Sequence, residues 1–182
     1  MSTAPHRLIV LDRDGVINED SDDYVKSPDE WIPIPGSLEA IARLTHAGFD
    51  IAIATNQSGI GRGLYTLDAL HAMHDKMLEL LGPLGGRIDG IFYCPHAPEA
   101  NCECRKPKPG LFRQIAESFG RKDLQGVPIV GDTRRDLEAG MALSGEPWLV
   151  LTGKGASTFA NGVPEGTRVR PSLAAIAREL AP

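Results

Sequence analysis

The chain has 182 residues, of which 42% are hydrophobic and 24% charged, and its formal net charge is -5 at pH 7. These values are typical of a globular protein of about one domain. The negative charge argues against a general nucleic-acid or membrane-surface binder, because both functions favour basic faces. No run of about 18 apolar residues predicts a membrane-spanning helix, and residues 1–7 contain no apolar stretch that would predict a signal peptide.

Short apolar runs alternate with helical patterns along the whole chain. Ser37 and Thr66 are predicted to cap the first two helices, and Gly48 to follow the first. The alternation predicts an α/β fold, a Rossmann-like doubly wound parallel sheet with helices on both faces. No repeat or linker divides residues 1–182, so one domain is expected. Strands are predicted at 8–12, 49–55, 88–93, 128–132 and 148–151, and helices at 38–44, 66–82, 109–119, 134–143 and after 172.

Polar residues stand where four of the predicted strands end. They are Asp12, Thr55, Cys94 and Asp132. In doubly wound sheets, ligands bind beyond the carboxyl ends of the strands. We therefore expect two acids and a hydroxyl to gather at one edge of the sheet.

The segment LDRDGVIN, residues 11–18, carries the strongest functional pattern. Asp12 and Asp14 are two residues apart on an extended chain, so both carboxylates can face one ligand, and Gly15 lets the backbone turn away. A carboxylate can attack phosphorus once a divalent cation offsets the charge, and Asp12, Asp132 and a backbone carbonyl are oxygen ligands that suit Mg2+. The alternative is a solvated acidic turn after a strand.

Two further segments could bind phosphate oxygens. The loop from Thr55 to Ser58 (TNQS) ends a strand with hydrogen-bond donors, and Lys106 lies just before a predicted helix, where it could neutralise a transferring phosphoryl group. In isolation, each is equally compatible with an ordinary polar or basic loop. Asp136 in GDTRRD is either a second acid or a first-turn helix residue, and the second interpretation is slightly favoured.

Together these motifs resemble the haloacid dehalogenase superfamily of phosphohydrolases over nearly the whole chain. The resemblance implies that Asp12 is the nucleophile and Asp14 the general acid and then base. It also implies that Thr55 and Lys106 stabilise the phosphoryl group, and that Asp12, Asp132 and the Asp14 carbonyl hold Mg2+. No interval between the motifs has room for a lid domain, so a capless member is expected.

The three cysteines of the chain lie in one short segment, residues 94–104. An odd, clustered set without a secretion signal predicts reduced thiols or a metal site in the cytoplasm. A Cys-x-His pair followed by Cys-x-Cys suits tetrahedral structural zinc; the alternative is a trio of thiols beside an incidental histidine. The predicted zinc ligands are Cys94, His96, Cys102 and Cys104.

The combination of DRDGVIN, TNQSGIGRG, YCPH, CECRKPKPG and GDTRRD resembles more narrowly the D-glycero-D-manno-heptose 1,7-bisphosphate 7-phosphatases, which are related to histidinol phosphatases. The resemblance implies a hydrolase for a small phosphorylated sugar in lipopolysaccharide synthesis, with no nucleic-acid or membrane partner; a monomer is the default expectation. The implied substrate-binding residues are Arg13, Asp20, Ser21, Asp22, Asp23, Tyr24, Asn56, Gln57, Ser58, Arg105 and Thr133.

Other functions remain open at this level. A histidinol-phosphate phosphatase would share the core and the zinc loop, although Arg105 favours a substrate with a second anionic group. A polynucleotide 3'-phosphatase is weakened by the acidic charge, and a non-catalytic zinc-stabilised binding module would be expected to have lost an essential acid. His71 and His74 are interpreted as a solvated pair on a helix rather than as metal ligands.

Overall fold

The computed structural model describes residues 7–182 of the protein. The expectation about a signal peptide therefore falls largely on residues 1–6, outside that range. None of the helices formed by residues 7–182 combines the length and the apolar character that crossing a membrane requires.

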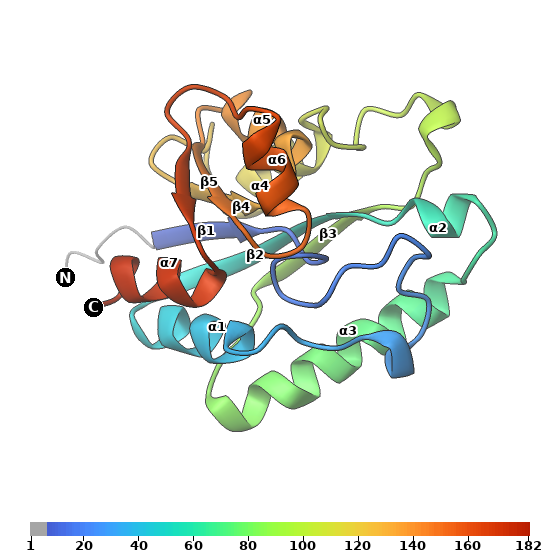
Figure 1. Cartoon of the computed structure of the whole chain (residues 1–182), viewed down its shortest axis with the longest axis horizontal. Helices are drawn as coiled ribbons and strands as arrows, with labels where there is room; N and C mark the ends of the chain where they lie inside the picture. Colours follow the sequence, from blue (N-terminus) through green and yellow to red (C-terminus); the bar gives the residue numbers. More distant parts are fainter. Residues whose placement is uncertain (1–6) are drawn as a thin grey trace.

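Six parallel strands form one sheet in the order β3-β2-β1-β4-β5-β6 (Figure 1). This arrangement confirms the predicted parallel sheet. Strands β1 to β5 are short and rich in apolar residues, as expected where both faces of a sheet are covered, whereas the edge strand β6 has the sequence RVR. The strands are β1 Arg7–Leu11, β2 Phe49–Asn56, β3 Gly90–Cys94, β4 Pro128–Gly131, β5 Glu146–Val150 and β6 Arg168–Arg170.

Helices cover both faces of the sheet. Figure 1 shows α1, α3 and α7 below it and α4, α5 and α6 above it. The α-helices are α1 Ser37–His46, α2 Ser58–Gly61, α3 Leu67–Leu81, α4 Gly110–Ser118, α5 Arg134–Met141, α6 Gly155–Ala160 and α7 Leu173–Leu180. Short 3-10 helices occupy Pro28–Glu30, Gly82–Leu84 and Pro98–Ala100.

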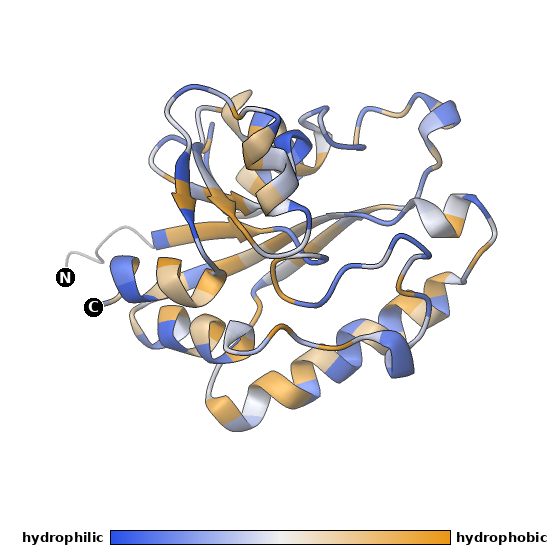
Figure 2. Cartoon of the chain, viewed as in Figure 1, coloured by the Kyte–Doolittle hydropathy of each residue, from blue (hydrophilic) through white to orange (hydrophobic). Residues whose placement is uncertain are grey.

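Two apolar cores lie on the two faces of the sheet, because successive strand residues point to opposite sides. Along β1, Ile9 and Leu11 belong to the larger core under α1, α3 and α7, whereas Leu8 and Val10 belong to the core under α4 and α5. Figure 2 shows the apolar residues concentrated on the strands. The central strands are thus held on both sides, which fixes the positions of the residues at their ends.

The order of the strands reverses between β1 and β4. The chain runs from β1 through β2 to β3 on one side, and then returns to β4 and continues outward through β5 to β6. Loops leaving β1 and β4 therefore diverge and leave a crevice at the carboxyl ends of these strands, which is where such folds bind ligands.

Several boundaries differ from the sequence predictions. Gly36, in a left-handed conformation, precedes α1, and Ser37 is the first helical residue; its hydroxyl donates to the carbonyl of Ile17 at 2.6 Å and therefore does not cap the helix. The prediction for Thr66 is confirmed, because its side chain accepts from the Ala69 N–H. The short elements α2, α6 and β6 were not predicted.

Candidate active site

Asp12 and Asp132 are brought together at the ends of β1 and β4. The Asp12 N–H donates to the carbonyl of Val130 at 2.9 Å, so the first residue after β1 still bonds to β4. Gly15 has φ +83, and a Cβ there would lie 2.1 Å from Asp132 Oδ2. A side chain at position 15 would therefore displace the Asp132 carboxylate, which explains why the turn after the DxD segment needs glycine.

Lys106 lies against the Asp12 carboxylate, although 94 residues separate them in the chain. Its ammonium donates to Asp12 Oδ1 at 3.0 Å, to Asp136 Oδ1 at 2.6 Å and to the carbonyl of Ala54 at 2.7 Å. Burial alone would lower the pKa of Lys106, but the charges of Asp12 and Asp136 outweigh it and raise that pKa. Lys106 is therefore a permanent cation at the floor of the site.

Negative charge exceeds positive charge around Lys106. Burial, followed by the charge of Asp136, raises the pKa of Asp12 well above its usual value and that of Asp132 to about 7. One carboxylate oxygen each from Asp12, Asp132 and Asp136 lies within 4.8 Å of the others. A divalent cation would offset this repulsion, so the donors and their charge fit Mg2+.

Asp136 has two roles in the structure. One oxygen accepts from the Thr133 N–H at 3.0 Å and from the Thr133 hydroxyl at 2.8 Å, which forms the capping box of α5. The other oxygen accepts from Lys106. The sequence pattern favours Asp136 as a first-turn helix residue over a second acid of the site. The contacts with Thr133 fit the first interpretation and the contact with Lys106 fits the second. Because both oxygens are occupied, Asp12 and Asp132 are better placed as metal ligands.

The Asp14 carboxylate lines the same pocket as Asp12 and Asp132 and accepts three hydrogen bonds. Oδ1 accepts from Arg13 Nη2 at 2.9 Å and from Asn18 Nδ2 at 3.0 Å, and Oδ2 accepts from Gln57 Nε2 at 3.0 Å. Burial alone would raise the pKa of Asp14, but the Arg13 charge and these donors lower it. Its side chain is thus ionised and oriented, and only its carbonyl remains a candidate metal ligand.

The loop after β2 supplies polar groups to the same site. Asn56 binds the backbone of Lys106 from both ends of its amide, at 3.2 and 3.0 Å. Gln57 donates to Asp14 and to Thr55 Oγ1, and accepts from the Tyr65 hydroxyl. Thr55 is fully buried behind Gln57, whereas Asn56, Gln57 and Ser58 line the pocket.

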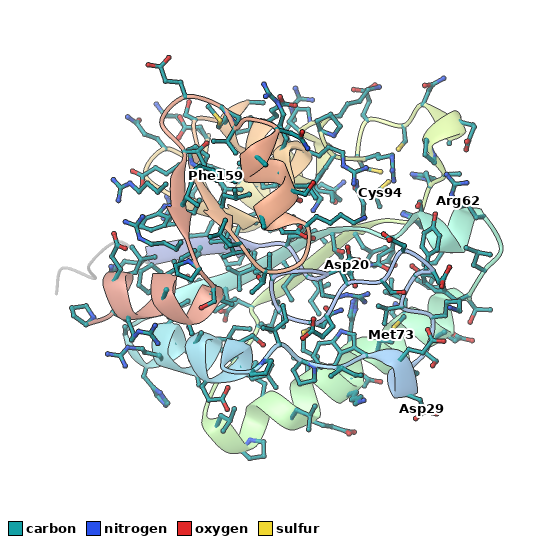
Figure 3. The ribbon with its side chains drawn as sticks, in the orientation of Figure 1. Asp20, Asp29, Arg62, Met73, Cys94 and Phe159 are labelled. Atoms are coloured by element: carbon teal, nitrogen blue, oxygen red, sulfur yellow. The ribbon has the colours of Figure 1, made fainter. Side chains whose placement is uncertain are left out.

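The pocket encloses about 240 Å³ and is walled by the loop after β1. Four of the five residues predicted in this loop line the pocket, namely Asp20, Ser21, Asp22 and Tyr24. The fifth, Asp23, does not line it. Figure 3 shows Asp20 on this loop and Cys94 at the end of β3, both on the side of the molecule away from the chain ends. This wall adds further carboxylates to one side of the pocket.

Two arginines line the pocket near the Cys/His segment. Arg105 Nη1 is buried and has no hydrogen-bond partner within the described part of the chain. Burial lowers the pKa of Arg105, and the positive charges of Arg135 and Arg62 lower it further. Arg105 and Arg135 both line the pocket, so an anion bound between them would relieve their repulsion and supply an acceptor. Arg135 was not singled out in the sequence, although it lies three residues after Asp132.

The segment after β5 also belongs to the site and was missed in the sequence. The Lys154 N–H donates to Asp132 Oδ2 at 2.9 Å, and the Thr152 hydroxyl donates to the carbonyl of Gly15 at 2.7 Å. The Lys154 ammonium lies 3.5 Å from Asp20 and 3.6 Å from Asp22. The signal was available, because this segment also follows a strand end.

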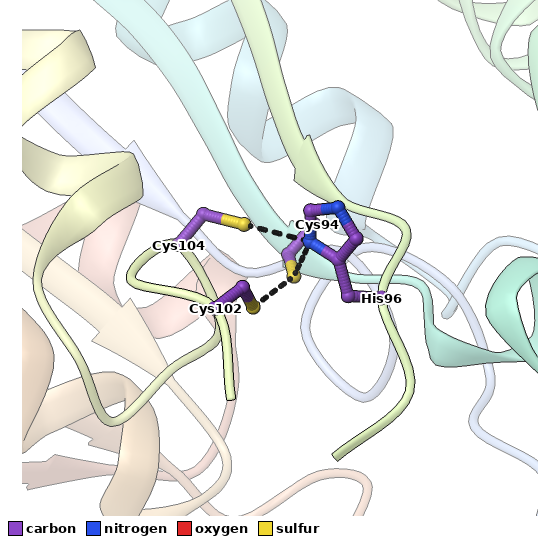
Figure 4. A group of neighbouring side chains, drawn as sticks. All are labelled: Cys94, His96, Cys102 and Cys104. Atoms are coloured by element: carbon purple, nitrogen blue, oxygen red, sulfur yellow. Dashed lines mark hydrogen bonds between the residues drawn. The ribbon is translucent and has the colours of Figure 1, made fainter. Parts of the chain in front are cut away.

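Cys94, His96, Cys102 and Cys104 converge beyond β3 (Figure 4). The Sγ of Cys94 lies 3.5 Å from His96 Nδ1 and 3.5 Å from the Sγ of Cys102, and His96 Nδ1 lies 3.2 Å from the Sγ of Cys104. Tetrahedral zinc with bonds of about 2.0–2.3 Å places its ligands about 3.5 Å apart. Three sulfurs and one nitrogen at this spacing fit a structural zinc ion.

The interpretation of the two helix histidines is wrong for one of them. His71 is exposed on α3, as predicted, but His74 is only 6% exposed. The side chain of Arg13 is also buried, and it contacts His74 and Asp14. Arg13 lines the pocket, but its guanidinium group is engaged with His74 and Asp14, so the substrate-binding role expected for it stays a prediction.

Family models match two parts of the chain. Residues 7–136 match the family described as polynucleotide kinase 3 phosphatase, and residues 103–176 match the HAD-hydrolase-like family. Together they span every motif of the site, from the DxD segment through the Cys/His cluster to Asp132 and Asp136.

Relatives and solved structures agree on a narrower group. A D-glycero-beta-D-manno-heptose-1,7-bisphosphate 7-phosphatase of Pseudomonas aeruginosa is 57% identical, over 95% of this chain and 97% of the relative. The crystal structure of D,D-heptose 1,7-bisphosphate phosphatase from B. bronchiseptica, complexed with magnesium and phosphate, is 56% identical with a TM-score of 0.94, and the match covers 96% and 97% of the two chains. A similar phosphatase from Burkholderia thailandensis is 50% identical with a TM-score of 0.76, over 96% and 97%.

Proposed function

The chain belongs to the family of D-glycero-beta-D-manno-heptose-1,7-bisphosphate 7-phosphatases, and from this premise we propose that it removes the 7-phosphate of the beta anomer through a phosphorylated Asp12. The product would serve nucleotide-heptose and lipopolysaccharide synthesis. The observation that carries the proposal is the buried Lys106 donating to the carboxylate of Asp12 in a pocket that also contains a separate pair of arginines.

Mg2+ suits this reaction, and the related structure from B. bronchiseptica contains it with phosphate. The residues that would hold it are Asp12, Asp132 and the Asp14 carbonyl, and it would supply positive charge against the phosphate oxygens. The repulsion that raises the pKa of Asp12 and Asp132 supports this assignment.

In the first step, an Asp12 carboxylate oxygen attacks the phosphorus, and the bond from phosphorus to the C7 oxygen breaks. Lys106 offsets the charge on the transferring group. The departing sugar oxygen takes a proton from Asp14. Since Arg13 and Asn18 both donate to Oδ1, this proton is expected on Oδ2. Asp14 is ionised in the resting structure, and the negative charge of the incoming phosphate would raise its pKa and favour protonation.

In the second step, Asp14 is again a carboxylate and takes a proton from a water molecule. The resulting hydroxide attacks the phosphorus, the bond to Asp12 breaks, and inorganic phosphate leaves. Using one carboxyl as acid and then base requires that it be held in place throughout, which the three donors to Asp14 would do.

The 1-phosphate would bind between Arg105 and Arg135. Arg105 has a buried Nη1 without a partner, and both residues line the pocket on the side of the Cys/His segment. A second phosphate accepts hydrogen bonds from guanidinium groups in a bidentate manner. Histidinol phosphate offers no second anion, which makes it the weaker candidate.

The Cys/His cluster would hold one structural zinc ion. All four donors are protein atoms, which leaves no coordination position for a substrate. Cys104 immediately precedes Arg105 and Lys106, so the zinc would fix the loop that supplies both cations. We further propose that residues 1–182 act as a single catalytic unit and as a monomer in the cytoplasm, where the thiols would stay reduced.

The test is phosphate release in Mg2+ from both anomers of heptose 1,7-bisphosphate, from histidinol phosphate and from a 3'-phosphorylated oligonucleotide. The proposal expects the beta anomer to give the highest kcat/KM, with Asp12→Asn abolishing the activity. A preference for histidinol phosphate would contradict the substrate while keeping the mechanism. A preference for the oligonucleotide would instead support the polynucleotide family model, and activity retained by Asp12→Asn would contradict the nucleophile.

The matched variants for the second phosphate are Arg135→Gln and Arg134→Gln. Arg135 lines the pocket, whereas the neighbouring Arg134 is exposed and pairs with Glu138. We expect Arg135→Gln to raise KM for the bisphosphate about tenfold or more and to leave a monophosphate substrate unaffected. An equal effect of both variants would contradict the assignment.

A further inference from the structure

A buried histidine lies directly behind the DxD segment. His74 is on α3, one of the three helices below the sheet in Figure 1, and only 6% of it is exposed. Its Nε2 lies 3.2 Å from Nη1 of Arg13. His74 does not line the pocket, whereas Arg13 does, so any part that His74 has in the reaction must pass through Arg13.

The protonation state of His74 follows from its partner. A guanidinium group has only donors, so the Nε2 that faces it must be the acceptor. The ring proton is therefore on Nδ1, and the ring is neutral. Burial and the charge of Arg13 lower the pKa of His74 to about 4, in agreement with a neutral ring. His74 thus offers Arg13 a fixed acceptor at neutral pH.

Arg13 joins this acceptor to the carboxylate of Asp14. Its side chain is fully buried; Nη2 donates to Asp14 Oδ1 at 2.9 Å, and Nε has no partner among the described residues. Removal of the histidine acceptor would leave a second buried donor unpaired. The guanidinium would then be expected to move, because an unsatisfied buried donor is costly. Such a movement would also displace one of the two donors to Asp14 Oδ1.

We propose that His74 is a positioning residue for the acid–base carboxyl of Asp14 and acts through Arg13. This link from His74 through Arg13 to Asp14 rests on the proposed function, since it assumes that Asp14 transfers protons. Arg13 and Asn18 both donate to Oδ1, whereas Oδ2 accepts from Gln57 alone, so Oδ2 is the oxygen that exchanges the proton. His74 holds the guanidinium in the one place where it serves both partners, and α3 therefore contributes to the chemistry without touching the substrate.

The variants are His74→Leu, which removes the acceptor, and His74→Gln, whose amide oxygen can still accept from Arg13. His71→Leu is the control, one turn earlier on the exposed face of α3. Two substrates separate acid catalysis from general damage. The alkoxide of the heptose bisphosphate needs a proton in order to leave, whereas p-nitrophenolate leaves without one.

In single turnover, we expect His74→Leu to slow phosphoryl transfer from the heptose bisphosphate tenfold or more. The single-turnover rate of p-nitrophenolate release from p-nitrophenyl phosphate should fall by less than threefold. His74→Gln should restore the sugar rate to within threefold of wild type, and His71→Leu should remain within twofold. An equal loss with both substrates, an unchanged sugar rate in His74→Leu, or no rescue by glutamine would each overturn the proposal.

Asp14→Asn separates this link from the proposed function. If Asp14→Asn keeps full activity on the sugar, then Asp14 is not the acid–base group and both proposals fail. If Asp14→Asn is inactive while His74→Leu is normal, only the link through Arg13 fails.

Nitrogen NMR on the wild-type protein provides a test that does not depend on a folded variant. The His74 ring should be neutral at pH 6, with its proton on Nδ1 and a pyridine-type Nε2. A protonated ring at pH 6, or a proton on Nε2, would overturn the assignment of His74 as acceptor.

Discussion

Two clusters of potential metal ligands lie at the same edge of the sheet, but they are held in different ways. The acidic cluster stands at the ends of β1 and β4, where the Asp12 N–H bonds directly to Val130. In the Cys/His cluster, only Cys94 belongs to a strand, and the other three ligands lie in a segment whose only regular element is one 3-10 turn.

The difference shows what each cluster owes to the fold. At the acidic cluster, the sheet forces carboxylates together against their repulsion, and Lys106 and a cation are needed to offset the charge. At the Cys/His cluster, the backbone does little to fix the ligands, so a bound metal would organise the loop itself. The first site is thus built by the fold, and the second would help to build the fold around it.

Lys106→Met should have the largest effect, because it removes the charge that the acidic cluster cannot replace. We expect phosphate release to fall about a thousandfold, in line with the loss of a group that stabilises transition-state charge. Steady-state kinetics would measure this change. Lys108→Met is the matched control, since Lys108 is half exposed and pairs with Glu103. Activity within tenfold of wild type would show that the cluster balances its charge without Lys106.

Cys104→Ser tests the other cluster and should have a smaller effect on catalysis. We expect bound zinc to be lost, the thermal midpoint to fall by more than about 5 °C, and activity to fall about tenfold as the loop carrying Arg105 and Lys106 loosens. Metal analysis, thermal unfolding and kinetics would measure these changes. Wild type that is stripped with a chelator and supplied again with Mg2+ should show the same losses as Cys104→Ser. Added zinc should restore activity and stability to the stripped wild type and not to the variant. A variant free of zinc but fully active and stable would contradict the structural role.

His74 makes stability depend on pH on the acidic-cluster side. Its pKa is lowered to about 4 in the folded state, against about 6.5 for an unperturbed histidine. The unfolded chain thus binds a proton first as the pH falls, and stability present above pH 6.5 is lost between about 6.5 and 4.

Between pH 7 and pH 5, this loss amounts to about 2 kcal/mol in the free energy of unfolding. Urea unfolding of wild type and His74→Gln at the two pH values would measure it, and the variant should lose less by that amount. An equal loss of unfolding free energy in wild type and variant would indicate that His74 is protonated in the folded protein as readily as in the unfolded chain.

Thr66→Ala should have the smallest effect. Its hydroxyl accepts from the Ala69 N–H at 3.1 Å at the start of α3, and loss of such a cap costs about 1 kcal/mol of stability. Chemical denaturation would measure this loss, and kinetics should show unchanged turnover. A drop in activity would indicate that the acidic cluster depends on the first turn of α3 as well as on His74.

Much of the fold and of the site follows from short-range patterns in the sequence. The ends of apolar runs located Asp12, Thr55, Cys94 and Asp132, because parallel strands bring their carboxyl ends to one edge. The spacing of Cys102 and Cys104 was enough to predict their convergence. These features depend on local periodicity and on one rule about parallel sheets.

The remainder depends on contacts between distant segments. Thr152 contacts Gly15 across 137 positions in the chain. Its place after a predicted strand indicates the edge of the sheet where it lies, but not its partner there. His74 resembles its exposed neighbour His71 in every local respect, and only the packing of α3 against Arg13 distinguishes them. The strand β6 has three residues, too few for a periodic pattern to be visible.

The two oxygens of the Asp136 carboxylate have different partners, and this has an evolutionary consequence. One oxygen caps α5 and the other holds Lys106, so a single replacement would damage a helix end and the catalytic charge balance at once. Selection for stability and selection for turnover act on the same atoms there. Positions 106 and 136 are therefore expected to drift very slowly, and to change, where they change at all, as a pair.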